Sequence, residues 1–260
     1  PGDSGGPLMV DDDGELKVAG VNSHLYFSDP FAVCGPFGGG VFVNGFADVV
    51  ASDLALWVSQ IVNAAGVTCQ GRPTTLVGSS FRDVLVGGPD VDAIHGRGSR
   101  DIILGQGSGD YLCGGKGGDD IFGGGGNDRI IGEPGLDYIE GNGGNDVIKG
   151  NGGNDVILAG QGADTVDGGK GNDTIRGNNG PDLLRGNGGF DDIAGQGGPD
   201  VIEGGKSADG LRGGRGNDAI SGNGGDDDLL GNAGDDTLNG GAGVDNCAGG
   251  PGTNTLIACP

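Results

Sequence analysis

The chain has 260 residues, of which 66 are glycine, and 37 acidic residues against 14 basic ones give a net charge of −23. A chain with this much negative charge repels nucleic acid and anionic lipid, and we therefore expect neither as a partner. No stretch approaches the ~18 consecutive apolar residues of a membrane span. Glycine shows no triplet period either, which excludes a collagen helix.

The first predicted element is a short apolar strand that follows a serine flanked by glycines. The segment "PGDSGGPLMV", residues 1–10, places Ser4 in a tight turn, where the backbone amides of Gly2 and Ser4 can point at one carbonyl oxygen. Such a pair of donors is the outline of an oxyanion hole. Residues 53–66 predict an amphipathic helix that Gly66 ends.

This N-terminal part, residues 1–66, resembles the end of a trypsin-like serine protease domain. G-D-S-G-G-P matches the nucleophile motif of that family, and the resemblance implies that Ser4 is the nucleophile and that Gly2 contributes to the oxyanion hole. It also implies strands at residues 18–23 and 38–44, and a secreted endopeptidase with a protein or peptide substrate. The family's catalytic His and Asp stand far upstream of the serine, whereas only three residues precede Ser4. We therefore expect a C-terminal portion of a longer protein that is inactive without the missing residues; His24 and His95 are interpreted as surface residues.

Residues 67–77 are expected to be a linker, and from Gly78 to Ile257 the sequence repeats every nine residues without an insertion. An aliphatic residue usually stands two positions after each Asp, and a glycine stands five positions before it, with Ala159 as the exception. A disordered glycine-rich tract has no such phase, so this interpretation is excluded. The Asp column starts with Asp83 and Asp92 and continues through the candidate metal ligands Asp101, Asp110, Asp119, Asp128, Asp137, Asp146, Asp155, Asp164, Asp173, Asp182, Asp191, Asp200, Asp209, Asp218, Asp227, Asp236 and Asp245.

One unit, such as "GGKGNDTIR" at residues 168–176, predicts a turn over its first six residues and a short strand over its last three. Two units then form one flattened coil, and about ten coils stack by parallel pairing with the aliphatic column inside. This thin core does not offset the ordering of so many glycines, and the stacked turns bring like charges into rows. A cation that prefers carboxylate and carbonyl oxygens solves both problems, and calcium has that preference. The residues offer no His and Cys cluster for zinc.

The phrase G-G-x-G-x-D-x-aliphatic-x resembles the RTX, or haemolysin-type, calcium-binding repeat. The resemblance implies a parallel β-roll over residues 78–260, with several calcium ions between stacked turns, in an extracellular protein that folds on binding calcium. The fold class is therefore all-β, with the roll preceded by the last strands and closing helix of a trypsin-like barrel. Two functions fit the chain: the end of a secreted protease, or a non-catalytic extracellular calcium-binding or adhesive protein with a decayed protease domain.

The five cysteines indicate an oxidising compartment. Cys247 replaces an aliphatic residue in the last coil, and we expect a disulfide between Cys247 and Cys259. Cys69 and Cys113 are either free or bridged to each other. Two residues before each Asp, the first four units have Phe81, Asp90, Ser99 and Ser108 instead of glycine, and Ser207 is the fifth exception. If this position needs a strained turn, calcium binds more weakly from Gly78 to Cys113 than beyond.

Overall fold

The computed structural model describes residues 8–10, 16–18 and 66–259, and the chain divides into two units, residues 1–61 and 62–260. In the first unit the described residues form one antiparallel hairpin, in which β1 (Leu8–Val10) pairs with β2 (Leu16–Val18). Gly2 and Ser4, the strand expected at residues 38–44 and the helix expected at residues 53–66, apart from its last residue Gly66, lie outside the described residues.

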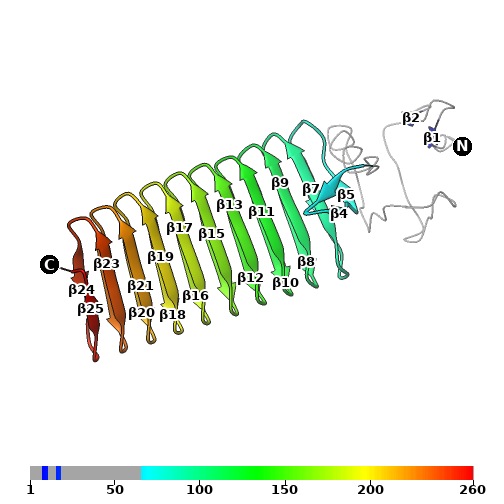
Figure 1. Ribbon diagram of the computed structural model, residues 1–260. Coiled ribbons are helices and arrows are strands. Elements are labelled where there is room, and N and C mark those ends of the chain that lie inside the picture. The colour runs from blue at the N-terminus through cyan, green and yellow to red at the C-terminus, as the bar shows by residue number, and fades with distance from the viewer. Residues whose placement is uncertain (1–7, 11–15, 19–65, 260) are drawn as a thin grey trace, which may run out of the picture. The chain divides into compact units, whose positions relative to one another are not determined.

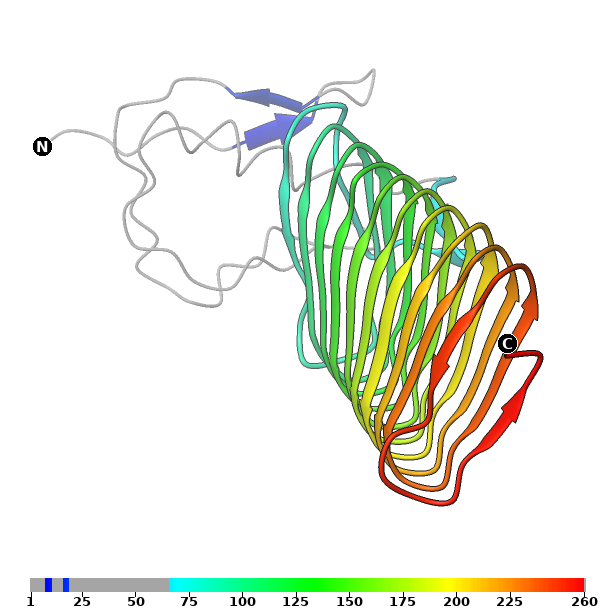
Figure 2. The same ribbon diagram turned by 90° about the vertical axis from the view of Figure 1, so that its left-hand side faces the viewer.

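The second unit is a parallel β-solenoid of about ten coils (Figure 1). Each coil contributes one strand to each of two sheets, which face each other across a narrow interior (Figure 2). We call them the even sheet, with strands β6 to β24, and the odd sheet, with strands β5 to β25. Within this unit the described residues contain no helix, and the separate hairpin of β3 (Thr68–Cys69) and β4 (Arg72–Pro73) precedes the solenoid.

Most of the strands have six residues. The even sheet contains β6 (Val84–Val86), β8 (Ile102–Gly107), β10 (Asp120–Gly125), β12 (Tyr138–Gly143), β14 (Val156–Gln161), β16 (Thr174–Asn179), β18 (Asp192–Gly197), β20 (Gly210–Arg215), β22 (Asp228–Ala233) and β24 (Asn246–Ala248). The odd sheet contains β5 (Leu76–Val77), β7 (Ala93–Gly98), β9 (Tyr111–Lys116), β11 (Arg129–Pro134), β13 (Val147–Gly152), β15 (Thr165–Lys170), β17 (Leu183–Gly188), β19 (Val201–Lys206), β21 (Ala219–Gly224), β23 (Thr237–Ala242) and β25 (Thr255–Ile257).

The register of the sheets follows from the nine-residue period. Every paired residue lies beside the residue two units away, so that Ile148 of β13 lies beside Ile130 of β11 and Val166 of β15. Because side chains alternate along a strand, the aliphatic residue of every unit points inward. From Leu85 to Leu238 this column is at most 2% exposed and forms one continuous core.

Two details differ from the sequence-based expectations. The strands are longer than three residues, because the segment after the aliphatic residue stays extended and resumes pairing: Asn178 and Asn179 pair with Gln196 and Gly197. Only three residues, such as Gly171, Asn172 and Asp173, remain for the turn. The expected linker, residues 67–77, instead contains β3, β4 and β5, and β5 is the first strand of the odd sheet.

Candidate calcium-binding turns

The turns between the sheets, and the strand ends that lead into them, depend on backbone conformations that favour glycine. We number the positions of one unit so that the Asp is position six. Positions two and four both have positive φ through most of the array, for example 109° at Gly169 and 117° at Gly171. At position four the turn also lies directly on the turn of the preceding coil, since a Cβ on Gly153 would overlap the carbonyl oxygen of Gly135. Glycine at this position is therefore favoured by stacking as well as by φ.

The exceptions at position four fall into two groups. Ser99, Ser108 and Ser207 adopt positive φ, at 79°, 72° and 85°, which a serine adopts only with strain. Phe81 and Asp90, in contrast, do not have a positive φ. Apart from Gly135, position four therefore has its repeating conformation from the third unit onward, and the first coil is built differently.

The Asp column connects each coil to the one before it. In every unit from Asp101 to Asp245, Oδ1 accepts a hydrogen bond from the backbone N–H of the Asp 18 residues earlier; the N–H of Asp110 donates to Asp128 over 2.7 Å. The second oxygen, Oδ2, has no hydrogen-bond partner from Asp101 to Asp236, although it is buried. Buried polar atoms are nearly always satisfied, so a regular series of unpartnered carboxylate oxygens indicates a binding site for a cation.

These free oxygens lie in a space bordered by backbone carbonyls. A Cβ placed on Gly114 would stand 2.5 Å from Oδ2 of Asp119 and 2.6 Å from the carbonyl oxygen of Gly132 in the next coil. The position-one glycine thus keeps open a space that carboxylate and carbonyl oxygens share. Oxygen donors of this kind suit calcium, whereas magnesium retains its waters in preference to such a cage.

The carboxylates stand in single file, one per coil at each edge. Among the described residues no three His, Cys, Asp or Glu side chains cluster closely enough to hold a metal ion. Column carboxylates alone therefore do not complete a site, and backbone carbonyl oxygens of the turns must supply the remaining ligands. With column carboxylates and turn carbonyl oxygens together as ligands, the residues of these turns fit calcium.

Burial makes the ionised column unfavourable in the absence of a cation. The pKa of Asp128 rises from 3.8 to about 7, first because burial removes the carboxylate from water and then because Asp146 and Asp110 bear like charges; the hydrogen bond from the Asp110 amide opposes the rise. Burial is also the main cause for Asp182 and Asp209, whose pKa values rise to about 7 as well.

The two ends of the column differ from its interior. In the first coil, Oδ2 of Asp83 accepts hydrogen bonds from the backbone N–H and the hydroxyl of Ser79, and Oδ2 of Asp92 accepts one from the N–H of Gly88. In the last turn Asn254 replaces Asp: its Oδ1 accepts the N–H of Asp236, and its Nδ2 donates to a carbonyl. At Asp92 and Asn254, the side chain leaves no unpartnered oxygen like those of the interior units.

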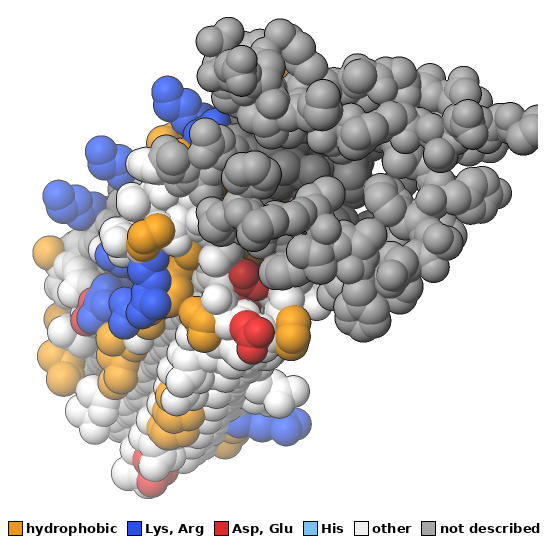
Figure 3. Space-filling model, turned by 90° about the vertical axis from the view of Figure 1, so that its right-hand side faces the viewer, with side chains coloured by type: hydrophobic (Ala, Val, Ile, Leu, Met, Phe, Trp, Pro, Cys, Tyr) orange, Lys and Arg blue, Asp and Glu red, His pale blue; other side chains and the backbone are white. Residues whose placement is uncertain are grey.

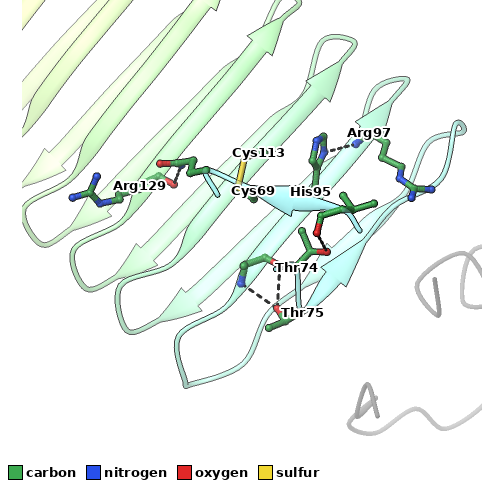
Figure 4. Close-up of a disulfide and its surroundings, with 10 residues drawn as sticks. Cys69, Thr74, Thr75, His95, Arg97, Cys113 and Arg129 are labelled. Carbon is green, nitrogen blue, oxygen red and sulfur yellow. Dashed lines mark hydrogen bonds between the residues drawn. A yellow bond between two sulfur atoms is a disulfide. The ribbon is translucent and has the colours of Figure 1, made fainter. Parts of the chain in front are cut away.

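A disulfide lies at each end of the solenoid. Cys247 and Cys259 are bridged, as the sequence led us to expect, and Cys69 and Cys113, whose pairing was left open, are bridged to each other. The second bridge fixes the β3–β4 hairpin on the outer face of the odd sheet (Figure 4). Gln70 donates a hydrogen bond to the carbonyl of Arg129, and the guanidinium of Arg72 lies 4.0 Å from the centre of the Tyr111 ring.

Sequence reasoning missed a second hydrogen-bond ladder at position five. The side-chain oxygen of Asn127 accepts the N–H of Asn145, and Asn145 in turn accepts the N–H of Ala163. The ladder is interrupted at Ala163, whose side chain has no acceptor, and at Pro181, which has no N–H. It resumes at Asn217, which accepts the N–H of Asp235. The frequent Asn and Asp immediately before the column Asp was the available signal. His95, expected at the surface, is half-buried, and its Nδ1 accepts the N–H of Arg97.

The fold and these turns define a calcium-binding parallel β-roll. A family model described as "RTX calcium-binding nonapeptide repeat (4 copies)" matches residues 77–112, 114–148, 149–184, 185–220 and 221–256, well over half of the chain. The chain belongs to this family. A comparison with curated proteins found no match. Among the described residues, no helix is long and apolar enough to cross a membrane.

Proposed function

We propose that the roll is a calcium-dependent folding module, in which calcium takes up the column carboxylates and allows the coils to stack. The supporting observation is the regular series of buried, unpartnered Oδ2 atoms from Asp101 to Asp236. RTX repeats and disulfides are typical of secreted proteins, where calcium is plentiful. We assign the column Asps as ligands from Asp101 to Asp245, and the first coil and Asn254 as ends that hold calcium weakly or not at all.

The electrostatics give the expected size of the calcium dependence. A rise in the pKa of Asp128 from 3.8 to about 7 corresponds to ~4 kcal/mol of folding free energy when the carboxyl is ionised without a counterion. Many column residues undergo a comparable rise, and a domain has only about 5–15 kcal/mol of net stability. The calcium-free roll therefore does not stay folded with its column ionised at neutral pH.

A pair of matched variants of the full chain tests this function. Asp128→Asn keeps the shape of the side chain and an oxygen for the N–H of Asp110, but it removes a proposed ligand and a buried charge. We expect fewer bound calcium ions and a weaker dependence of thermal stability on calcium. Asp90→Asn makes the same change at an exposed carboxylate outside the column and should alter neither property. Equal calcium binding by Asp128→Asn and the parent chain would contradict the ligand assignment.

For residues 1–66 we propose the C-terminal portion of a trypsin-like serine endopeptidase, with Ser4 as nucleophile and Gly2 in the oxyanion hole. The G-D-S-G-G-P motif supports this, and the described hairpin, Leu8–Val10 with Leu16–Val18, follows directly after it. With its upstream half supplied, the protein should be labelled at Ser4 by an organophosphonate, and Ser4→Ala should abolish labelling and peptide cleavage. Hydrolysis that survives in Ser4→Ala would exclude this nucleophile. An upstream half without a His and an Asp in trypsin-like order would instead favour the second candidate, a non-catalytic calcium-binding or adhesive protein.

A further inference from the structure

The acidic charge of the chain is concentrated in the Asp column. The nineteen column residues from Asp83 to Asp245 account for nineteen of the 23 net negative charges and leave a net charge of only four for the remainder. All of them except Asp92 are buried. Once calcium neutralises the column, the outer surface is close to neutral, and its local charges decide what it binds.

The outer faces of the two sheets differ in charge. Seven consecutive strands of the odd sheet, β7 to β19, each contribute one basic residue: Arg97, Lys116, Arg129, Lys149, Lys170, Arg185 and Lys206. Together the same seven strands contain only three acidic residues, Glu133, Asp167 and Glu203. The even sheet has three basic residues, Arg176, Arg212 and Arg215, against four acidic ones, Asp120, Glu140, Asp192 and Asp228. In Figure 3 most of the Lys and Arg side chains in view gather along one side of the roll.

The basic side chains of the odd sheet are also largely unpaired. Among the described residues, only Arg185 of the seven forms an ion pair, with Glu203 over 2.8 Å. The carboxylate of Asp167 accepts a hydrogen bond from Asn187. Lys170 and Lys206 are exposed and have no acidic partner among the described residues. Their ammonium groups are therefore available to an external anion.

These two lysines flank a hollow in the outer face of the odd sheet. Lys170 and Lys206 both pair with Gly188, one from each side, so they lie two strand spacings, or about 10 Å, apart in the same row. The hollow is shallow and open to solvent, and it is lined by Gly169, Lys170, Asn187, Gly188, Gly205, Lys206, Asn223 and Gly224. Glycines keep its floor low, and Asn223 offers an amide donor beside the two cations.

We propose that this face of the odd sheet, centred on Lys170 and Lys206, binds an anionic polysaccharide when the roll is loaded with calcium. Ammonium groups at a regular spacing match carboxylate or sulfate groups along an extended polymer, and amide side chains suit the hydroxyl groups of sugar rings. Single-stranded nucleic acid needs aromatic side chains for base stacking, and the odd-sheet strands from β11 to β25 contain none. The proposal rests on calcium loading, because an unneutralised column repels any polyanion.

Binding of the full chain to four polymers, measured with calcium in excess, tests the proposal: heparin, hyaluronate, neutral dextran and oligo(dT). We expect binding to heparin or hyaluronate that weakens with salt and is absent for dextran. The Lys170→Ala/Lys206→Ala double variant should lose about tenfold in affinity. Arg212→Ala/Arg215→Ala removes the same number of charges from the even sheet and should leave affinity within about twofold of the parent.

Three results would overturn this surface: no binding to either anionic glycan, equal loss in both double variants, or tighter binding to oligo(dT) than to the glycans. Far-UV circular dichroism of each variant with calcium keeps the two proposals separate. A chain that folds with calcium but binds no glycan disproves only the surface. A chain that does not respond to calcium disproves the folding module.

Discussion

Replacing Gly153 by alanine should disrupt the stacking of turns at one place, whereas the same change at the adjacent Gly152 should not. Gly153 has a φ of 144°, and a Cβ there would lie well inside 3.0 Å of the carbonyl oxygen of Gly135. The backbone conformation alone costs about 1–3 kcal/mol for a residue with a side chain. The overlap with Gly135 adds to this, since backbone atoms do not move aside without breaking the pairing between coils. At Gly152 a Cβ meets nothing within 4 Å.

Amide hydrogen exchange of the calcium-loaded chain measures this difference locally. Because each coil contacts only its neighbours, Gly153→Ala should lower protection mainly in the coils that contain Gly135, Gly153 and Gly171, with less effect at the two ends. Gly152→Ala should leave protection unchanged or raise it slightly, since alanine restricts the unfolded chain more than glycine does. Equal protection in the two variants would refute the argument that position four is fixed by contact between turns.

Three further predictions concern protons, disulfides and the order of calcium binding. The raised pKa of Asp128, about 7 against 3.8, means that the folded, calcium-free roll binds protons more tightly than the unfolded chain. Its stability should therefore be greatest near pH 4 and fall as the pH rises through 7; calcium affinity should instead weaken below pH 7, because protons compete for the carboxylates. Thermal unfolding with a chelator across this range checks the sign, and stability that rises with pH would contradict it. Cys113→Ser should lower stability by roughly 2–4 kcal/mol by releasing a 44-residue loop, and mass mapping of the unreduced parent should find Cys69 joined to Cys113 and Cys247 to Cys259; free thiols at these positions would exclude the bridges. In a calcium titration followed by amide exchange, protection should appear first in the interior coils and last around Asp83 and Asp92, and simultaneous protection would argue against weak sites at that end.

The sequence predicted the solenoid because its strongest signal is also its strongest physical constraint. An aliphatic residue every nine positions without an insertion requires that each coil repeat the last, so the period alone identifies the inward column of Ile148 and its neighbours. The extent of the strands was less predictable. Gly168, Gly169 and Lys170 suggest a turn by composition, yet they belong to strand β15, because Gly169 and Lys170 pair with the neighbouring coils.

The candidate calcium site was predictable in its residue type but not in its detail. The Asp column was evident from the period. That Oδ1 accepts an N–H of the preceding coil while Oδ2 has no hydrogen-bond partner depends on contacts between coils, which no single unit encodes. The difference between Asp92 and the interior Asps also comes from neighbours, since its oxygens bond to Thr75 and Gly88. Cys69 and Cys113 are 44 residues apart in the sequence. They meet only because the β3–β4 hairpin packs on the outer face of the odd sheet.

The central claim, that calcium on the Asp column is what allows the roll to fold, is tested most directly by far-UV circular dichroism of the full chain near neutral pH. In a chelator the roll should be largely unfolded. Added calcium should produce a β-type spectrum and a thermal transition that rises with calcium concentration, and magnesium at the same concentration should not replace it. A chain with the same β-type spectrum and the same thermal transition in chelator and in calcium would contradict the claim.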